Sequence, residues 1–510
     1  MTVEYIATFD LGTEGTKTSL VTVEGELVAS EFTPYDVNYP KPCWAEQDPE
    51  IWWKAVVQNT REAIRKSGIS PDDIVGFGGD GMMFTVLPLD EGGKPLRPAI
   101  IWLDSRAEEQ VGEYFGGLER DLMELLDDGI IPATSGKDVI PKLLWLRDNE
   151  PDVFKRTHKF VDSKDYIVYK CTGKFNTDWT CANLTGMFSF KRKKWDNAMI
   201  GITGLTPEHF PEATSTINVV GELKSDAAKE LGLPEGIPVI SGSGDPAAIA
   251  LGTGAIKEKK PHLYIGSSSW IALHLKEPVF DVDTGIGSIC SGDPSKLLAI
   301  GQMENAGSCL KWLRDNVFRE EKIAAEESGN IYALMDEIAE NTDPGADKLI
   351  FMPWMSGERC PFMDPAVRGG FVNLCFNHGR GHMARAVMEG VAFNIKWIIE
   401  SFENLGFSME SLNTSGGGAR SDFWLQTISD ITGKVLNRVR SPLEAGSRGA
   451  AMMVGAALGI YKDFDSLEAF THIETKFYPK KENKKTYDMI FKQFKKTYEN
   501  LTDIHCALNL

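Results

Sequence analysis

The sequence predicts an α/β protein made of two similar halves. A short apolar run at residues 237–240 is followed by a turn of serines and glycines and then by Asp245, where a helix can start. A hairpin with a glycine- and threonine-rich tip spans residues 10–17, and a similar tip at residues 266–269 opens the second half. Because both tips offer backbone N–H groups and hydroxyls to a phosphate, we expect a duplicated architecture with a nucleotide in a cleft between the halves.

Length and composition indicate a large globular protein. The 510 residues are enough for two or more domains, and 42% hydrophobic with 25% charged residues is an ordinary globular composition. The net charge of −19 argues against a nucleic acid or an anionic membrane as partner. The eight cysteines form no C-x-x-C pair, no run approaches 18 apolar residues, and the N-terminus lacks a signal-peptide pattern. We therefore expect reduced thiols and a cytoplasmic protein.

The first hairpin is predicted from strands at residues 5–9 and 19–23. Its tip carries Gly12 and Thr13, and Lys17 is a nearby cation for a phosphate. Asp10 stands at the end of the first strand, where a carboxylate can hold Mg²⁺ through water. The alternative interpretation is an ordinary hairpin with a polar tip.

The next segment contains a helix, several strands and one acid–base pair. Residues 43–66 lead into a helix, and residues 74–89 hold two strand-like runs around a glycine-rich stretch. A further strand ends at Asp104 and Arg106, which could bind hydroxyls or pair with each other at the surface. Residues 142–146 are expected on an amphipathic helix, in packing rather than in chemistry.

The second half repeats the use of glycine at turns. A triple glycine at residues 416–418 lies between a strand and a helix, where the backbone can approach a flat ligand closely. The other elements expected here are strands at residues 263–265 and 270–275, helices within residues 301–312 and 381–393, a small-residue helix suited to close packing at residues 447–458, and a charged, solvated amphipathic helix at residues 480–510.

Asp245 has two interpretations. As a carboxylate at the tip of a strand, with glycines clearing space around it, it would act on a ligand, since ligands of open α/β sheets bind just outside the carboxyl ends of strands. As a helix cap it would be structural, because Asp is a preferred N-cap and Pro246 suits the first helical position. The phosphate-type turns elsewhere in the chain favour the first interpretation.

Taken in order, these motifs resemble the FGGY family of carbohydrate kinases, in the sugar-kinase branch of the actin/hexokinase superfamily. The resemblance covers nearly the whole length, and within the family it is greatest to xylulokinases. The segments that carry it are FDLGTEGTK, WAEQDPEIWW, LRPAIIWLDSRA, SGSGDPAAIALGTGA, LYIGSSSW, SGERCPFMDPAVRGGF, HMARAVMEG and SGGGARSDFWLQ.

The resemblance implies two domains, residues 1–254 and 255–510, each with a ribonuclease-H-like sheet flanked by helices. ATP would lie in the interdomain cleft and the sugar mostly on the N-terminal domain. Asp245 would be the general base that accepts the proton of the sugar hydroxyl, and Asp10 would help to hold Mg²⁺. The residues implied at the nucleotide are Gly12, Thr13, Lys17, Gly266, Ser267, Gly307, Gly417, Gly418 and Asp422.

The sugar side departs from the xylulokinase pattern. Asp104 would hydrogen-bond the sugar, but the Gly-Gln-Met-His-Gly stretch of xylulokinases has no His counterpart here. A gapless register places Met82, Met83 and Phe84 at the Gln, Met and His, whereas a shift of two residues places Asp80 at the Gln. We expect Asp80, Met83 and Phe84 at the sugar; the gapless register favours a deoxy or methyl-bearing sugar, and the shifted one ordinary pentuloses.

Three further positions depart from the family. Pro246 stands where xylulokinases often have Asn, and Val139 and Asn373 break the two signature patterns. The expected activity is ATP-dependent phosphorylation of a sugar hydroxyl, with a pentulose such as xylulose as the leading substrate. The alternatives are a kinase of glycerol, erythritol, ribulose, fuculose or a deoxy sugar, and a nucleotide-driven binding protein without phosphotransfer. The expected partners are the sugar and ATP, and a homodimer is one expected assembly.

Overall fold

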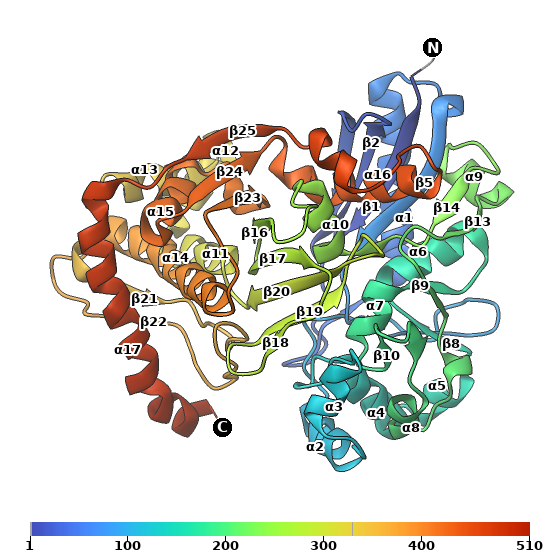
Figure 1. Ribbon diagram of the computed structural model, residues 1–510, viewed down its shortest axis with the longest axis horizontal. Coiled ribbons are helices and arrows are strands. Elements are labelled where there is room, and N and C mark those ends of the chain that lie inside the picture. The colour runs from blue at the N-terminus through green and yellow to red at the C-terminus, as the bar shows by residue number, and fades with distance from the viewer. Residues whose placement is uncertain (1–2, 329, 510) are drawn as a thin grey trace. The chain divides into compact units, whose positions relative to one another are not determined.

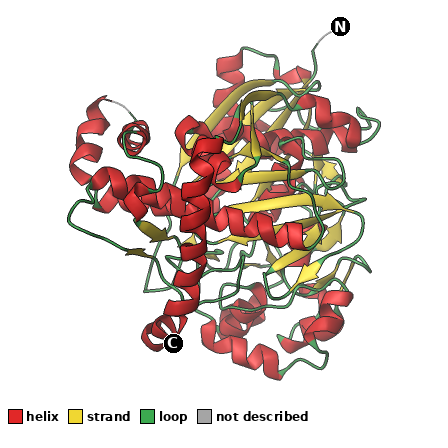
Figure 2. Ribbon diagram, turned by 60° about the vertical axis from the view of Figure 1, so that its left-hand side comes forward, coloured by secondary structure: helices red, strands yellow, loops and turns green. Residues whose placement is uncertain are grey.

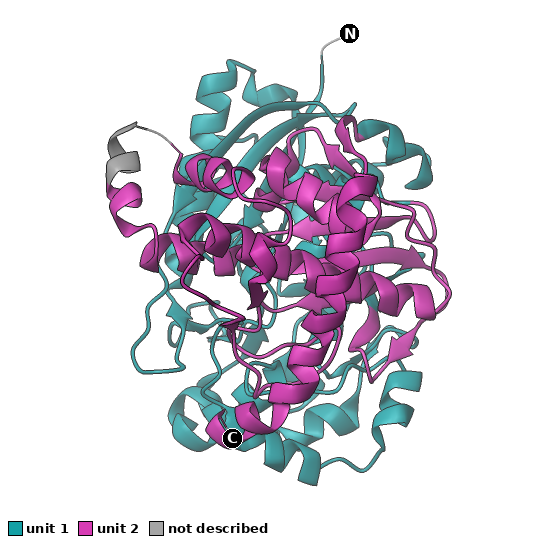
Figure 3. Ribbon diagram, turned by 90° about the vertical axis from the view of Figure 1, so that its left-hand side faces the viewer, with its two compact units in different colours: residues 1–256, 289–298, 444–470 teal, residues 257–288, 299–443, 471–510 magenta. Residues whose placement is uncertain are grey.

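The computed structural model describes residues 3–328 and 330–509, which form two compact units. The first unit takes residues 1–256, 289–298 and 444–470, and the second takes residues 257–288, 299–443 and 471–510 (Figure 3). The longest segment of the first unit ends close to the division that the sequence predicts after residue 254. The prediction assigns residues 289–298 and 444–470 to the second domain, whereas the structure places them in the first unit.

The first unit is built on a seven-stranded sheet of order β13-β14-β5-β1-β2-β3, with β15 also pairing with β5. Strands β1 and β2 form an antiparallel hairpin, whereas β5 is parallel to β1 and β14 is parallel to β5. Strand β1 is buried along most of its length, as expected for a central strand covered on both faces. The strands are β1 (Tyr5–Leu11), β2 (Gly15–Thr22), β3 (Leu27–Pro34), β5 (Ile74–Gly81), β13 (Val219–Glu222), β14 (Pro238–Ile240) and β15 (Ser243–Gly244).

Helices cover both faces of this sheet, because alternate residues of β1 belong to different cores. Phe9 packs with residues of α1, α6 and α9, and Ile6 packs with residues of α10 and α16. Helix α1 begins after the N-cap Asp48 and ends before Gly68, which has a φ of 68°. The helices are α1 (Pro49–Ser67), α6 (Ser163–Thr172), α9 (Ser225–Leu231), α10 (Asp245–Gly252) and α16 (Ala445–Ala457).

Close contact between α10 and α16 explains why residues 444–470 belong to the first unit. A Cβ atom on Gly449 would lie 1.9 Å from the carbonyl oxygen of Ala248, and one on Gly252 would lie 1.7 Å from the carbonyl oxygen of Ala445. Only glycine permits this approach at the two positions. The close packing predicted for residues 447–458 is therefore confirmed.

A smaller part of the first unit surrounds its own apolar core, which includes Ile100, Leu143 and Trp145. Its strand pairs are β4 (Glu46–Gln47) with β7 (Ala99–Ile100), β6 (Leu87–Leu89) with β8 (Lys159–Val161), β9 (Asn176–Asp178) with β12 (Glu212–Thr214), and β10 (Phe188–Ser189) with β11 (Lys194–Trp195). Its helices are α2 (Glu108–Gly116), α3 (Leu122–Asp127), α4 (Val139–Asn149), α5 (Pro151–Arg156), α7 (Trp179–Leu184) and α8 (Asn197–Ile202).

The second unit repeats the strand arrangement of the first. Its eight-stranded sheet has the order β18-β19-β20-β17-β16-β23-β24-β25. Strand β16 is antiparallel to β17 and parallel to β23, as β1 is to β2 and β5, which confirms the predicted duplication. The strands are β16 (Pro261–Ile265), β17 (Ser269–Leu275), β18 (Phe280–Asp281), β19 (Ile286–Cys290), β20 (Leu297–Met303), β23 (Ser411–Ser415), β24 (Val435–Val439) and β25 (Ile473–Phe477).

Helices also flank the second sheet (Figure 2). The long helix α14 packs against α13, α15 and β21 (Figure 1). The remaining elements are α11 (Gly307–Asn316), α12 (Arg319–Ser328), α13 (Ile331–Glu340), α14 (Arg380–Asn404), α15 (Asp422–Thr432) and α17 (Lys484–Asn509), with the strand pair β21 (Ile350–Met352) and β22 (Gly370–Val372).

Helix α17 is less solvated than the sequence suggests. Its residues Tyr487, Ile490, Phe491 and Phe494 are buried, so one side of the helix belongs to the core of the second unit. The predicted segment extends to Leu510, which lies outside the described residues. None of the helices in the described part of the chain combines the length and the apolar character needed to cross a membrane.

Candidate active site

Three carboxylates meet in the first unit near the carboxyl ends of β1 and β5. Asp10 on β1 is the register partner of Asp80 on the neighbouring parallel strand β5. Asp245 begins α10 directly after β15, in which Ser243 is the register partner of Asp80. One carboxylate oxygen from each of the three residues lies within 4.8 Å of the others. Sheet topology thus gathers acids that are far apart in the sequence.

Asp245 does not cap its helix. The N-cap of α10 is Gly244, and Asp245 is the first helical residue, so Pro246 occupies the second position and not the first. Asp245 is half-buried, and its enclosed Oδ1 atom has no hydrogen-bond partner among the described residues. The capping interpretation is therefore wrong, and the carboxylate is available to a ligand.

Burial raises the pKa of all three carboxyl groups. The charges of Asp10 and Asp245 raise the pKa of Asp80 further, and the charge of Asp10 does the same for Asp245. Lys17 acts in the opposite direction and lowers the pKa of Asp10 and Asp80. Its Nζ lies 3.9 Å from Asp10 Oδ2 and 3.9 Å from Glu444 Oε1. The cluster therefore favours a bound proton or a cation.

The donor set suits a hard divalent cation, because each of the three acids offers a carboxylate oxygen. Asp10, the residue predicted at Mg²⁺, is a member of the cluster. Buried carboxylate oxygens without hydrogen-bond partners, on Asp80 and Asp245, are the groups that such an ion would satisfy. The residues present thus fit Mg²⁺.

The turn between β1 and β2 is shorter than predicted. Asp10 and Lys17 are paired strand residues, so the turn lies within residues 12–14. Side chains from elsewhere hold it: Tyr35 Oη donates to the carbonyl of Gly12 at 2.7 Å, and Trp102 Nε1 donates to Thr13 Oγ1 at 2.8 Å. The turn that carries Gly12 and Thr13 is therefore fixed next to the carboxylate cluster.

Asp104 and Arg106 pair with each other, but in the interior and not at the surface. The Asp104 carboxylate accepts hydrogen bonds from Arg106 Nη2 at 2.7 Å and from the backbone N–H of Ala45 at 2.5 Å. Arg106 Nη2 also lies 2.7 Å from Glu46 Oε1, and its guanidinium carbon is 3.7 Å from the ring centre of Trp44. Asp104 is fully buried in this network. Its predicted contact with a sugar stays a prediction.

Met83 packs against Gly244, the residue that directly precedes Asp245. A Cβ atom on Gly244 would lie 2.0 Å from Met83 Sδ, so the methionine occupies the space beside that glycine. Phe84 has a φ of 60°, and its carbonyl accepts a hydrogen bond from Lys142 Nζ at 2.9 Å. The segment that carries the predicted substrate residues is thus anchored at both positions.

Three residues at this site were not predicted: Glu444, Gly446 and Lys142. The first two approach the cluster only because α16 folds back onto the first unit. Lys142 is fully buried, donates to the carbonyl of Phe84 and to that of Ile101, and burial lowers its pKa to about 7. Residues 142–146 lie on α4 and all five are buried, which confirms their prediction as packing residues. A lysine inside the otherwise apolar run VIPKLLWL was the available signal for the polar contacts of Lys142.

In the second unit, the turn that follows β16 lies against the start of α11. The backbone N–H of Gly307 donates to the carbonyl of Gly266 at 2.9 Å, and that of Ser308 donates to the carbonyl of Ser267 at 3.1 Å. A Cβ atom on Gly307 would be 2.5 Å from the Gly266 carbonyl oxygen. The structure thus brings Gly266, Ser267 and Gly307 together at a helix N-terminus, where the first N–H groups of the helix are held by the turn carbonyls.

Gly417 and Gly418 also lie close to the end of β16. A Cβ atom on Gly418 would be 2.4 Å from Ile265 Cγ2, whereas one on Gly417 would meet no atom closer than 3.9 Å. Gly417 therefore leaves an open surface for a flat ligand. Asp422 begins α15, pairs with Arg438 and has a side chain that is 72% exposed.

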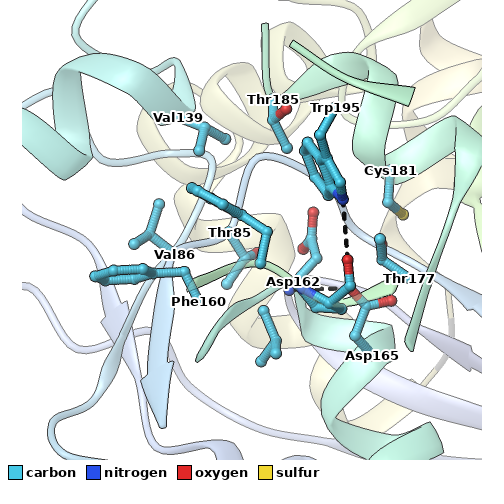
Figure 4. A pocket seen from close by; sticks show the side chains of 13 residues that line it. Thr85, Val86, Val139, Phe160, Asp162, Asp165, Thr177, Cys181, Thr185 and Trp195 are labelled. Atoms are coloured by element: carbon cyan, nitrogen blue, oxygen red, sulfur yellow. Dashed lines mark hydrogen bonds between the residues drawn. The ribbon is translucent and has the colours of Figure 1, made fainter. Parts of the chain in front are cut away.

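A separate cavity of about 30 Å³ lies in the first unit (Figure 4). Asp162 and Asp165 line it together with three threonines and mostly apolar side chains. Trp195 Nε1, which also lines it, donates to the carbonyl of Pro211 at 3.0 Å. A space of this size holds a water molecule or two and not a sugar. Burial, with the charge of Asp165, raises the pKa of Asp162 to about 7.

Comparisons with known proteins agree with this geometry. The N-terminal domain of the FGGY family of carbohydrate kinases matches residues 5–252, and the C-terminal domain of that family matches residues 263–458. The chain is 30% identical to the xylulose kinase of Staphylococcus xylosus, over 97% of this chain and 100% of the relative. It is 28% identical to the gluconokinase of Bacillus licheniformis, over 96% of this chain and 94% of the relative.

A solved structure confirms the predicted two-domain α/β fold. Ligand-bound xylulose kinase from Lactobacillus acidophilus matches with a TM-score of 0.87 at 25% identity, and the match covers 99% of this chain and 100% of that one. Together with the two domain matches, this shows an ATP-dependent sugar kinase and leaves no support for a binding protein without phosphotransfer. The chain belongs to the FGGY family of carbohydrate kinases.

Proposed function

We propose that this kinase transfers the γ-phosphoryl group of ATP to a hydroxyl of a pentulose such as xylulose, with Asp245 as the general base and Mg²⁺ beside Asp10. The observation that carries the proposal is the Asp245 carboxylate, whose enclosed Oδ1 has no hydrogen-bond partner among the described residues. It stands beside the Asp10 carboxylate and the turn that would face the phosphates.

The electrostatics of Asp245 suit proton acceptance. Burial raises its pKa, which favours holding the proton that a sugar hydroxyl gives up as it attacks phosphorus. Phosphoryl transfer otherwise needs positioning and charge stabilisation more than covalent help. Lys17 supplies a positive charge at the cluster, and a bound Mg²⁺ would neutralise charge on the phosphate oxygens.

The remaining nucleotide contacts are divided by unit. In the first unit Gly12 and Thr13 would lie near the transferred phosphoryl group. In the second unit, the turn that packs against the α11 N-terminus would lie beside the phosphates, and the open side of Gly417 would bind the flat adenosine. The residues proposed there are Gly266, Ser267, Gly307, Gly417, Gly418 and Asp422.

A pentulose is the substrate that the relatives favour, since xylulose kinases are among the relatives matched over nearly the full length of both chains. Gluconokinase is also among the relatives, and both substrates are carbon chains with several hydroxyls. A deoxy or methyl-bearing sugar is a further candidate substrate. Met83 lies beside Gly244, and an apolar wall at this position suits such a sugar.

A coupled assay of ADP release over ketopentoses, polyols, deoxy sugars and gluconate tests the proposal. The expected result is the highest kcat/KM with a ketopentose. A higher value with gluconate, or with a deoxy sugar, would contradict the pentulose assignment and would leave the sugar-kinase activity intact.

A further inference from the structure

Asp80 adds a third acid to a site for which the family resemblance implies two, Asp10 and Asp245. It lies within β5, the residue is 1% exposed, and neither carboxylate oxygen has a hydrogen-bond partner among the described residues. An ionised carboxylate without partners is costly to bury. The Asp80 carboxylate therefore lacks the hydrogen bonds or the cation that would offset its burial among the described residues.

The neighbouring charges do not balance the cluster. Asp10, Asp80 and Asp245 carry three carboxylates, and Glu444 adds a fourth beside Lys17. Lys17 supplies one positive charge and lies at 3.9 Å from both Asp10 and Glu444, which is the outer limit of an ion pair. A divalent cation would remove most of the remaining charge.

The spacing of the oxygens matches a shared ion. Oxygens on opposite sides of a Mg²⁺ ion are about 4.2 Å apart, since each bond is about 2.1 Å long. The three carboxylate oxygens lie within 4.8 Å of one another, so small side-chain movements would bring all of them to one ion. Gly446 leaves room at this point, because a Cβ atom there would be 2.7 Å from Asp80 Oδ2 and 3.3 Å from Asp10 Oδ2.

We propose that Asp80 is a direct ligand of a divalent cation shared with Asp10 and Asp245, so that the protein binds Mg²⁺ or Mn²⁺ before nucleotide arrives. The identification of this ion as the metal of phosphoryl transfer rests on the proposed function. The binding of the ion itself does not.

Titration of the nucleotide-free, full-length protein with Mn²⁺ tests the inference, read by isothermal calorimetry and by the electron paramagnetic resonance signal of free Mn²⁺. The wild type should bind one Mn²⁺. Asp80→Asn should bind it at least roughly tenfold more weakly, because even residues that only support a metal ligand are worth about 10- to 100-fold in affinity. Asp72→Asn, at an exposed acid of the same unit, is the matched control and should bind as the wild type does.

The melting temperature is a second readout, and in the absence of metal the substitution should raise it although it weakens metal binding. Without metal, Asp80→Asn should melt at a higher temperature than the wild type, because Asn cannot ionise beside the carboxylates of Asp10 and Asp245. With Mn²⁺ the wild type should gain stability and the variant should gain little. Absence of Mn²⁺ binding by the wild type, or equal binding by Asp80→Asn, overturns the inference. ADP release with sugars, measured separately, shows whether the proposed function has failed instead.

Discussion

Gly446 lies directly against the carboxylate of Asp80, so that a Cβ atom on Gly446 would come within 2.7 Å of Asp80 Oδ2. The same atom would be 3.3 Å from Asp10 Oδ2. Gly446 is in the first turn of α16, far along the chain from both acids. The carboxylate cluster therefore depends on a glycine that sequence motifs around the acids do not reveal.

Gly446→Ala should lower kcat/KM, because the added methyl group displaces two carboxylates from their positions. Misplacement of reacting groups by about 1 Å can cost on the order of 100-fold in rate, and we expect a loss of about 10- to 100-fold. Steady-state kinetics with the best sugar measures it. Gly201→Ala is the control, since a Cβ atom at this helical position meets no atom within 4 Å. Equal activity of the two variants would mean that the cluster tolerates the methyl group.

Asp245→Asn should reduce kcat by roughly 10²- to 10⁴-fold, the usual contribution of a general base. ATP binding should persist, because the residues proposed for phosphate and adenosine lie largely elsewhere. Kinetics and calorimetric titration with ATP, on protein whose melting curve shows a folded state, provide the measurement. A variant with near-full turnover would show that the unpaired carboxylate is not the base.

Asp104→Ala should destabilise the first unit by about 3 kcal/mol, because it leaves the buried Arg106 guanidinium without its bidentate partner. Glu46 still faces Arg106, which limits the loss. Denaturant unfolding of the variant and the wild type gives the difference. Unchanged stability together with a raised KM for sugar would instead identify Asp104 as a sugar ligand.

Local patterns predicted the elements around Asp10 and Asp245 well. Each acid follows an apolar strand and precedes small residues, and both signals lie within a few residues of the acid. Those patterns also predicted the second hairpin, which the structure shows as β16 and β17. The preference of Asp for the N-cap position predicted the wrong first residue of α10, since Gly244 takes the cap position.

Long-range pairing accounts for what the sequence could not predict. The meeting of Asp80 with Asp10 depends on the register of β1 against β5, and the approach of Gly446 depends on α16 packing on α10. Neither register nor helix contact is encoded in a short motif. The same holds for Lys142, whose two carbonyl acceptors, at Phe84 and Ile101, come from other segments.

Asp162 should make folding stability depend on pH in a predictable direction. Its pKa is raised from 3.8 to about 7 in the folded protein, chiefly by burial. Between these two values the folded state holds the proton more tightly than the unfolded state does. The contribution of Asp162 to stability should therefore be largest at about pH 4 and below, and should fall as pH rises toward 7 by up to about 1.4 kcal/mol per pH unit, with no further change from this group above pH 7.

Asp162→Asn should remove this dependence and keep the start of α6. Asp162 is the N-cap of α6 and accepts the backbone N–H of Ser163 at 2.7 Å, a role that Asn fills without ionising. Urea unfolding at pH 4, 5, 6 and 7 should show the variant gaining on the wild type as pH rises. Asp121→Asn, at the exposed N-cap of α3, controls for the cap substitution itself. If the stability difference between Asp162→Asn and the wild type is the same at pH 4 and pH 7, Asp162 does not titrate in this range.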